Sequence, residues 1–177
     1  MFKGEKVYID AIRRDDLPRL MEWRNLSEYR KYFREYRELN SDMQQRWYEN
    51  KVLNDNSTEM FAIRLNDSGE LIGCCGLCYI NWVHRNADLS LYIGWRESYI
   101  DNEGYAEESC ALLFDYGFKE LGLQKIWTEI YSFDDKKMKL YAKLGFQKDG
   151  ELRNQYFYNG RWWNSYMLSL LTEEWDR

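Results

Sequence analysis

Strict alternation of apolar and polar side chains predicts several strands along this chain. The clearest case is ADLSLYIG (87–94), where Leu89, Leu91 and Ile93 alternate with Asp88 and other residues. A period of two places each set of side chains on its own face of a sheet. The other predicted strands are VYIDAIR (7–13), TEMFAIRL (58–65), LIGCCGLCY (71–79), KIWTEIY (125–131) and two closing segments at 147–158 and 162–171.

Turn residues indicate how two pairs of these strands are joined. The segment NDSGE separates the strands at 58–65 and 71–79, which is typical of a hairpin loop. The pair Asn159-Gly160 separates the last two strands. Asparagine and glycine both tolerate positive φ, so this pair predicts a type I′ turn.

Helices are expected where apolar residues recur at a period near 3.6 after a capping residue. The first is expected to begin at Asp15 or Asp16, with Pro18 in its opening turn. The longest spans 104–118 and has an amphipathic pattern. The two others are expected to begin at Ser41-Asp42 and after Asp134, the latter ending at Gly145.

These elements follow the order β-α-α-β-β-β-α-β-α-β-β, which predicts an α/β layered domain with helices on a mixed sheet. The 177 residues contain 45% hydrophobic and 18% aromatic side chains. That composition is typical of a packed core, and we expect one domain over residues 1–177.

Charge and hydropathy narrow the classes of partner. The net charge of −5, with both signs interspersed, disfavours nucleic acid, which needs a basic face. The chain contains no apolar run of the roughly 18 residues that a membrane span needs. The first residues, MFKGEKVYIDAIRR, lack the apolar core of a signal peptide, so a cytoplasmic location is expected.

Four cysteines raise the question of a thiol or metal site. Cys75 and Cys78 form a CxxC, but the sequence has no second cysteine pair and only one histidine, His84. In a strand, residues three apart point to opposite faces. We therefore interpret the cysteines as buried thiols and expect no metal; a metal site on Cys75 and Cys78 is the alternative.

The stretch YIGWRESYIDNEGYAEESC (92–110) takes the chain from a strand into a helix at Gly104-Tyr105-Ala106. Unpaired amides at a helix start bind anions, and small residues let a phosphate approach them. Close packing of this helix on the sheet accounts for the same residues equally well.

Several segments closely resemble the GNAT superfamily of N-acetyltransferases. The most specific are LYAKLGFQKDG (140–150) and QYFYNGRWWNSYMLSLL (155–171). YINWVHRNADLSLYI (79–93) is most similar to the branch that contains ribosomal-protein N-terminal and spermidine acetyltransferases. The resemblance covers essentially the whole chain and implies a GNAT-like, mostly antiparallel sheet flanked by helices.

The resemblance implies acetyl-CoA as co-substrate and assigns residues to it. The strand at Leu91 would pair with the pantetheine arm, and the loop before Ala106 would cradle the pyrophosphate. Two positions depart from the family pattern, because Asp101 replaces a glutamine or arginine and Asp134 replaces an asparagine. The implied cofactor contacts are Leu91, Tyr92, Ile93, Asn102, Glu103, Gly104, Tyr105, Ala106, Asp134 and Tyr141.

The implied catalytic residues are Tyr141, Asp88 and Leu91. Tyr141 would protonate the departing thiolate, since a tyrosine pKa near 10 is close to that of a thiol. The backbone N–H of Leu91 or its neighbour would polarise the carbonyl. Asp88 would act as base, with His84, Glu129 or no dedicated base as alternatives.

The acceptor amine is the least constrained part of the hypothesis. Segment 27–40 is expected to wall its site, with Tyr32, Arg34 and Glu35 as binding residues. A polyamine, an amino sugar and a protein N-terminus all remain open. The many cations of this segment weaken the polyamine interpretation, and its arginines could instead bind an anionic acceptor. The aromatic residues of 156–163 suit strand packing, a pocket wall or a homodimer. The alternative function is a regulatory module that binds acyl-CoA without catalysis.

Overall fold

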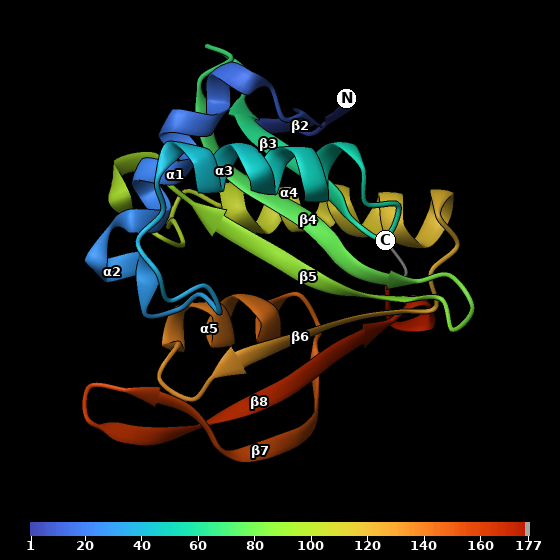
Figure 1. Cartoon of the computed structure of the whole chain (residues 1–177). Coiled ribbons are helices and arrows are strands. Elements are labelled where there is room, and N and C mark those ends of the chain that lie inside the picture. Colours follow the sequence, from blue (N-terminus) through green and yellow to red (C-terminus); the bar gives the residue numbers. More distant parts are fainter. Residues whose placement is uncertain (176–177) are drawn as a thin grey trace.

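One mixed sheet of eight strands organises the computed structural model, which describes residues 1–175 (Figure 1). The strand order is β1-β2-β3-β4-β5-β6-β8-β7, and every neighbouring pair is antiparallel except β5 and β6. The strands are β1 (Phe2–Lys3), β2 (Val7–Ala11), β3 (Glu59–Leu65), β4 (Leu71–Asn81), β5 (Asn86–Ile93), β6 (Lys125–Tyr131), β7 (Gln147–Tyr158) and β8 (Arg161–Leu171). All seven expected strands are present, and the two-residue β1 is an addition.

Among the described residues, five α-helices pack on this sheet. They are α1 (Leu17–Asn25), α2 (Ser27–Arg30), α3 (Ser41–Trp47), α4 (Tyr105–Asp115) and α5 (Asp135–Lys143). α3 and α4 continue into π-helical turns at Tyr48–Leu53 and Tyr116–Glu120, and 3₁₀ turns lie at Arg14–Asp16, Trp95–Glu97 and Thr172–Glu174. Within residues 1–175, no helix has both the length and the apolar character needed to cross a membrane.

The turn prediction and the Asp134 cap are confirmed, whereas Asp16 lies at the start of α1 without a side-chain capping hydrogen bond. The side chain of Asp134 accepts a hydrogen bond from the Lys137 N–H, as expected of a helix cap. Asn159 and Gly160 have φ of 50° and 76°, which is the type I′ geometry. α3 begins at Ser41, as expected, and the side chain of Asn40 caps it.

The two faces of the sheet are covered by different helices. In Figure 1, α3 lies in front of the sheet and α4 lies behind it. The Tyr92 hydroxyl donates to the Leu20 carbonyl of α1 at 3.4 Å, which places this side chain on the α1 face. Leu77, which pairs with Leu89 of β5, lies beside Gly117 in the π-helical turn after α4, on the opposite face. The alternation predicted for β5 therefore separates a site-facing set from a core set.

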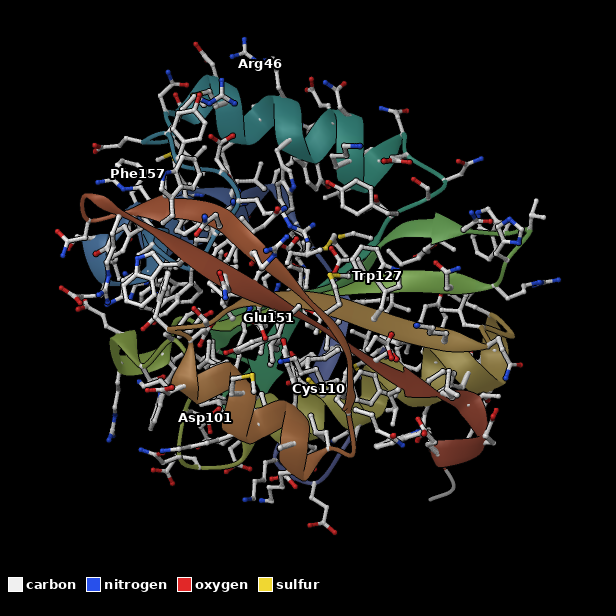
Figure 2. All side chains as sticks on the ribbon, turned by 90° about the horizontal axis from the view of Figure 1, so that it is seen from below. Arg46, Asp101, Cys110, Trp127, Glu151 and Phe157 are labelled. Atoms are coloured by element: carbon white, nitrogen blue, oxygen red, sulfur yellow. The ribbon has the colours of Figure 1, made fainter. Side chains whose placement is uncertain are left out.

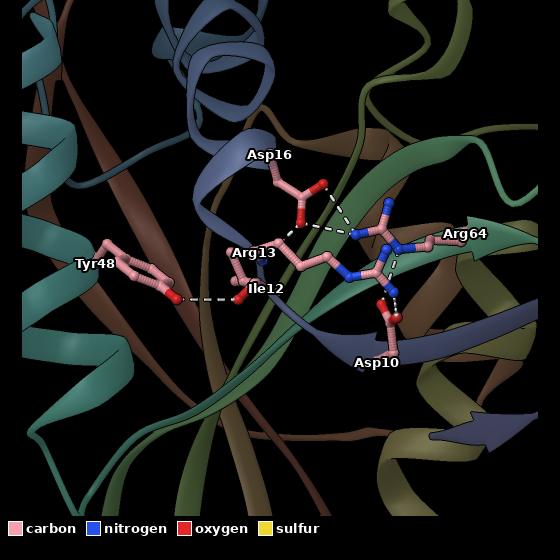
Figure 3. A network of polar contacts seen from close by, with 6 residues as sticks. All are labelled: Asp10, Ile12, Arg13, Asp16, Tyr48 and Arg64. Carbon is pink, nitrogen blue, oxygen red and sulfur yellow. Dashed lines mark hydrogen bonds and ion pairs between the residues drawn. The ribbon is translucent and has the colours of Figure 1, made fainter.

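A buried ion network joins β2, β3 and the start of α1 (Figure 3). The guanidinium of Arg64 is 6% exposed; its Nε lies 2.9 Å from Asp10 Oδ1, and its Nη2 lies 2.7 Å from Asp16 Oδ2. Asp16 also accepts the Arg13 N–H at 2.7 Å. Removing one partner of such a buried pair is costly because the other charge stays out of water.

We expect Asp16→Ala to lower the free energy of unfolding by about 3 kcal/mol, because Arg64 then keeps only Asp10 as a partner. Asp15→Ala is the matched control, since this neighbouring carboxylate is exposed. Its effect should stay within about 0.5 kcal/mol. Urea unfolding of both variants measures the difference, and equal effects would contradict a structural role for the network.

Candidate active site

The parallel strands β5 and β6 separate in the middle of the sheet. Their pairing covers Asn86 to Asp88, opposite Lys125 to Trp127, and no later pair joins them within residues 1–175. Figure 1 shows the two strands diverging from this point, with α5 beside the gap. The split leaves the second half of β5 without a strand neighbour on this side.

Leu91 turns its backbone polar groups toward this split. The N–H of Ile93, two residues along the strand, donates to the Tyr99 carbonyl and so faces away from β4. The Leu89 carbonyl, two residues back, accepts from Thr128 of β6. Residues two apart in a strand direct their backbone groups to the same side. The N–H and C=O of Leu91 therefore face the gap, as its predicted role in carbonyl polarisation requires.

A cavity of about 730 Å³ lies beside the split. Tyr32, Arg34 and Glu35, the predicted acceptor residues, all line it. Asp88 and Leu91 line it too, from β5. The structure thus brings the expected acceptor residues and two of the expected catalytic residues to one cavity.

Asp88 lies at the last paired position of β5 and is 5% exposed. Its Oδ2 accepts a hydrogen bond from Arg34 Nη1 at 2.7 Å, while its buried Oδ1 has no hydrogen-bond partner among the described residues. Burial raises the pKa of Asp88 from 3.8 to about 6, against the opposing effect of Arg34. A carboxylate with this pKa and one unused oxygen suits a general base.

The two other candidate bases have different surroundings. Glu129 of β6 lines the cavity, but its Oε1 accepts from the Ser165 hydroxyl at 2.6 Å and its Oε2 lies 3.8 Å from Arg34. His84 is exposed in the β4–β5 turn and does not line the cavity. The geometry favours Asp88 over both.

Tyr141 is completely buried, and its hydroxyl has no hydrogen-bond partner within residues 1–175. A buried hydroxyl is costly without a partner, which is consistent with an acceptor that a bound ligand supplies. Burial raises the pKa of Tyr141 well above 10. The near match to a thiol pKa, on which its role as an acid was argued, is therefore lost. The hydroxyl stays a protonated hydrogen-bond donor.

The start of α4 carries an anion-binding geometry, and Asp101 occupies it. The Asp101 carboxylate accepts from the N–H groups of Glu103, Tyr105 and Ala106 at 2.8, 2.9 and 2.8 Å. Three converging amides fit a phosphate as well as a carboxylate. The expectation that these amides are exposed is therefore wrong for the structure as it stands, because a local carboxylate satisfies them.

The small residues at this helix start have backbone and packing roles. Gly104 has φ of +89°, a conformation that other residues adopt with strain. Ala106 is buried, which agrees with the packing interpretation of the short side chain. Asn102 is exposed at the loop surface.

Asp134 is held by its own contacts at the start of α5. It is 2% exposed, accepts the Tyr99 hydroxyl at 2.6 Å and caps α5 at the Lys137 N–H. α5 in turn lies against the α4 start, since Lys143 pairs with Glu107 and Lys136 donates to the Ser98 carbonyl. Figure 2 likewise has Asp101 on the side of α5. The predicted cofactor residues of both helices thus lie on one side of the split.

Cys74, Cys75 and Cys110 are buried thiols as predicted, whereas Cys78 is partly exposed and lines the cavity, so the prediction of a core thiol is wrong there. Cys75 lies opposite Leu91 and Cys78 opposite Asp88 in the β4–β5 register, so the two side chains point to opposite faces. All four thiols are free, and burial raises the pKa of Cys78 to about 12. This opposes the thiolate form that metal binding needs.

Sequence reasoning missed two cationic residues of the cavity, Arg24 and Lys137. Lys137 stands four residues before Tyr141, and the helical period places the pair on one face of α5. That spacing was an available signal. No sequence signal pointed to Arg24, because only the packing of α1 against the second half of β5 brings this residue to the cavity.

Comparisons with known proteins agree with this geometry. A family model described as an acetyltransferase (GNAT) domain matches residues 6–147. Spermidine N(1)-acetyltransferase of Escherichia coli (strain K12) is 31% identical over 124 residues, covering 70% of this chain and 64% of that enzyme, less than two thirds of its length. The Vibrio cholerae enzyme of the same name is 28% identical over 162 residues, covering 90% of this chain and 89% of that enzyme.

The structure is also similar to that of a spermidine N-acetyltransferase. A crystal structure of spermidine N-acetyltransferase from Vibrio cholerae in complex with CoA and spermine has a TM-score of 0.88 and 25% identity. It covers 97% of this chain and 99% of that chain. The predicted fold and the predicted resemblance are confirmed, and the chain belongs to the GNAT acetyltransferase family.

Proposed function

We propose that the protein is an acetyl-CoA-dependent N-acetyltransferase that acts on the primary amine of a small molecule. The observation that carries this proposal is the β5–β6 split, which exposes the Leu91 N–H beside a cavity that holds Asp88. Family membership and a structural neighbour that binds CoA and spermine support it. The cytoplasmic location, a homodimer and a protein N-terminus as acceptor stay predictions.

Two observations indicate that the described residues can bind acetyl-CoA. The Tyr141 hydroxyl is buried without a partner, and three amides at the α4 start converge on an anion. Acetyl-CoA would supply an acetyl group already activated as a thioester. The backbone groups of Leu91 would hold its pantetheine arm, and the amides of Glu103, Tyr105 and Ala106 would hold its diphosphate once Asp101 has moved. The predicted pairing of Ile93 with this arm is wrong, because its N–H and C=O are already bonded to Tyr99 and Tyr29.

Each catalytic residue has one task in this proposal. Asp88 Oδ1 takes the proton that the acceptor ammonium must lose before its nitrogen can form the new C–N bond. The Leu91 N–H would donate to the carbonyl oxygen, on which negative charge develops as the nitrogen attacks the carbonyl carbon. That charge is lost when the C–S bond breaks and the carbonyl re-forms, and the second proton that the nitrogen loses balances the thiolate. The Tyr141 hydroxyl donates a hydrogen bond to the departing sulfur. Because burial keeps this hydroxyl protonated, it stabilises the thiolate mainly as a hydrogen-bond donor.

We expect Asp101→Ala to bind CoA about tenfold more tightly, because the diphosphate no longer competes with a carboxylate for three amides; tenfold corresponds to about 1.4 kcal/mol. The same variant should lose about 1 kcal/mol of stability without ligand, since it loses a helix cap. Calorimetry measures the first effect and thermal unfolding the second.

Asp67→Ala is the matched control for Asp101→Ala. It removes one negative charge from the exposed β3–β4 turn and should leave CoA affinity unchanged. Weaker CoA binding in Asp101→Ala than in the unmodified protein would mean that the carboxylate supports the site rather than competes for it.

The alternative is a module that binds acyl-CoA without transferring the acetyl group, and the position of Asp101 favours it. Release of free thiol from acetyl-CoA, with and without amines, separates the two functions. Amine-dependent release, with one acetyl group found on the amine by mass spectrometry, is the expected result. Tight CoA binding without amine-dependent release across polyamines, amino sugars and peptides would favour the alternative.

A further inference from the structure

The cavity contains more positive than negative side chains, although the chain as a whole carries a net charge of −5. Each of its carboxylates is already bound to an arginine. Asp88 and Glu129 face Arg34, and Glu35 accepts two hydrogen bonds from the guanidinium of Arg37. The cationic lining residues are Arg24, Arg34, Arg37, Arg46, Lys51 and Lys137, and the acidic ones are Glu35, Asp88 and Glu129.

Three of these cations have no carboxylate partner within residues 1–175: Arg24, Arg46 and Lys137. Arg24 is half-buried, its guanidinium lies over the Phe33 ring at 4.9 Å, and its Nε is buried with no hydrogen-bond partner among the described residues. Lys137 lies over the Tyr99 ring at 5.4 Å. A buried donor without an acceptor is costly, so the Arg24 guanidinium calls for an acceptor that a bound molecule can supply.

Arg24 and Asp88 lie in different parts of the cavity. Arg24 acts electrostatically on Cys74, Tyr92 and Glu35, whereas Lys137 and Arg34 act on Asp88. Arg46 belongs to α3 and projects from the opposite edge of the molecule to Asp101 (Figure 2). The cationic groups without partners thus extend from the split, where the base lies, to the α1 and α3 walls.

We infer that the acceptor is an amine that also carries a phosphate or carboxylate group, with its nitrogen at Asp88 and its negative group at Arg24. This inference rests on the proposed function. A polyamine has positive charge along its whole length, and Arg24, Arg46 and Lys137 would repel it without a compensating carboxylate. An amine with a negative group instead supplies the acceptor that the Arg24 guanidinium lacks.

A matched set of amino sugars tests the inference. Glucosamine is compared with glucosamine 6-phosphate, which adds a phosphate, and with muramic acid, which adds a carboxylate; spermidine is the polyamine. We expect calorimetry to show that one anionic sugar binds at least tenfold more tightly than glucosamine. Spermidine should bind more weakly than that anionic sugar. The ratio kcat/KM should follow the same order, and the two anionic sugars distinguish phosphate from carboxylate.

Arg24→Gln should lower affinity and kcat/KM for the preferred anionic sugar 10- to 100-fold and raise both for spermidine. Opposite effects on the anionic sugar and on spermidine indicate charge recognition, because damage to the fold would lower the affinity for both amines. Arg46→Gln, at an exposed position, should change affinity and kcat/KM for both amines in the same directions but by smaller factors. Arg19→Gln is the matched control on α1, because Arg19 pairs with Glu22 and does not line the cavity.

Three results would overturn the inference: tighter binding of spermidine than of both anionic sugars, no heat with either anionic sugar, or an equal loss for all four amines in Arg24→Gln. Amine-dependent thiol release alongside any of them would leave the proposed function standing. Charge-selective binding without acetyl transfer to any amine would instead keep the inference about the cavity and overturn the proposed function.

Discussion

Asp88→Asn is expected to lower kcat about 100- to 1,000-fold, within the range that general bases contribute. Asparagine keeps the size of the side chain and its hydrogen bond to Arg34 but cannot take a proton from the acceptor ammonium. Glu129→Gln is the matched control on the neighbouring strand. Both oxygens of Glu129 already face other groups, so its loss should cost about tenfold or less. Steady-state kinetics of both variants measure the difference.

The pH dependence gives an independent check on Asp88. Only the deprotonated carboxylate acts as a base, so kcat/KM of the unmodified protein should rise with pH through an apparent pKa of about 6. This acidic limb should be absent in Asp88→Asn. Arg34→Gln should move the limb to higher pH, because Arg34 lowers the pKa of Asp88. A limb that persists in Asp88→Asn, or stays in place in Arg34→Gln, would assign the base to another group.

Local chemistry made most of the fold predictable. Alternation along β5, the Asp134 cap and the Asn159-Gly160 turn depend on neighbours within about five residues, so the sequence alone contains them. β1 is two residues long, which is too short for a periodic pattern, and α2 is a single turn. Both are stabilised mainly by what they pack against.

The site was predictable in its residues and less so in its contacts. The period of β5 predicted that Asp88 and Leu91 lie on different faces, but the split from β6 depends on how distant segments pack. The capture of three amides by Asp101 is a local effect, since the donors lie two to five residues along the chain. Aspartate is a preferred capping residue, so the position of Asp101 shortly before the helix was an available signal. The role of Arg34 as partner of Asp88 spans 54 positions, beyond any local signal.

Tyr141→Phe is expected to lower kcat about 100-fold while leaving CoA affinity nearly unchanged, because the hydroxyl would contact only the departing sulfur, where charge develops in the transition state. The same substitution should not destabilise the fold. The Tyr141 hydroxyl has no partner among the described residues, so its removal relieves an unsatisfied buried group and should raise stability by up to about 1 kcal/mol.

Tyr29→Phe is the matched control for stability, because both tyrosines are fully buried. The Tyr29 hydroxyl donates to the Ile93 carbonyl at 2.6 Å and accepts the Tyr99 N–H at 2.7 Å. Its removal should cost about 2 kcal/mol, since two buried backbone groups lose a partner. Thermal unfolding and single-turnover kinetics together decide the role of Tyr141. A variant Tyr141→Phe with normal turnover, or with a stability loss like that of Tyr29→Phe, would make Tyr141 a packing residue and leave the thiolate to another donor.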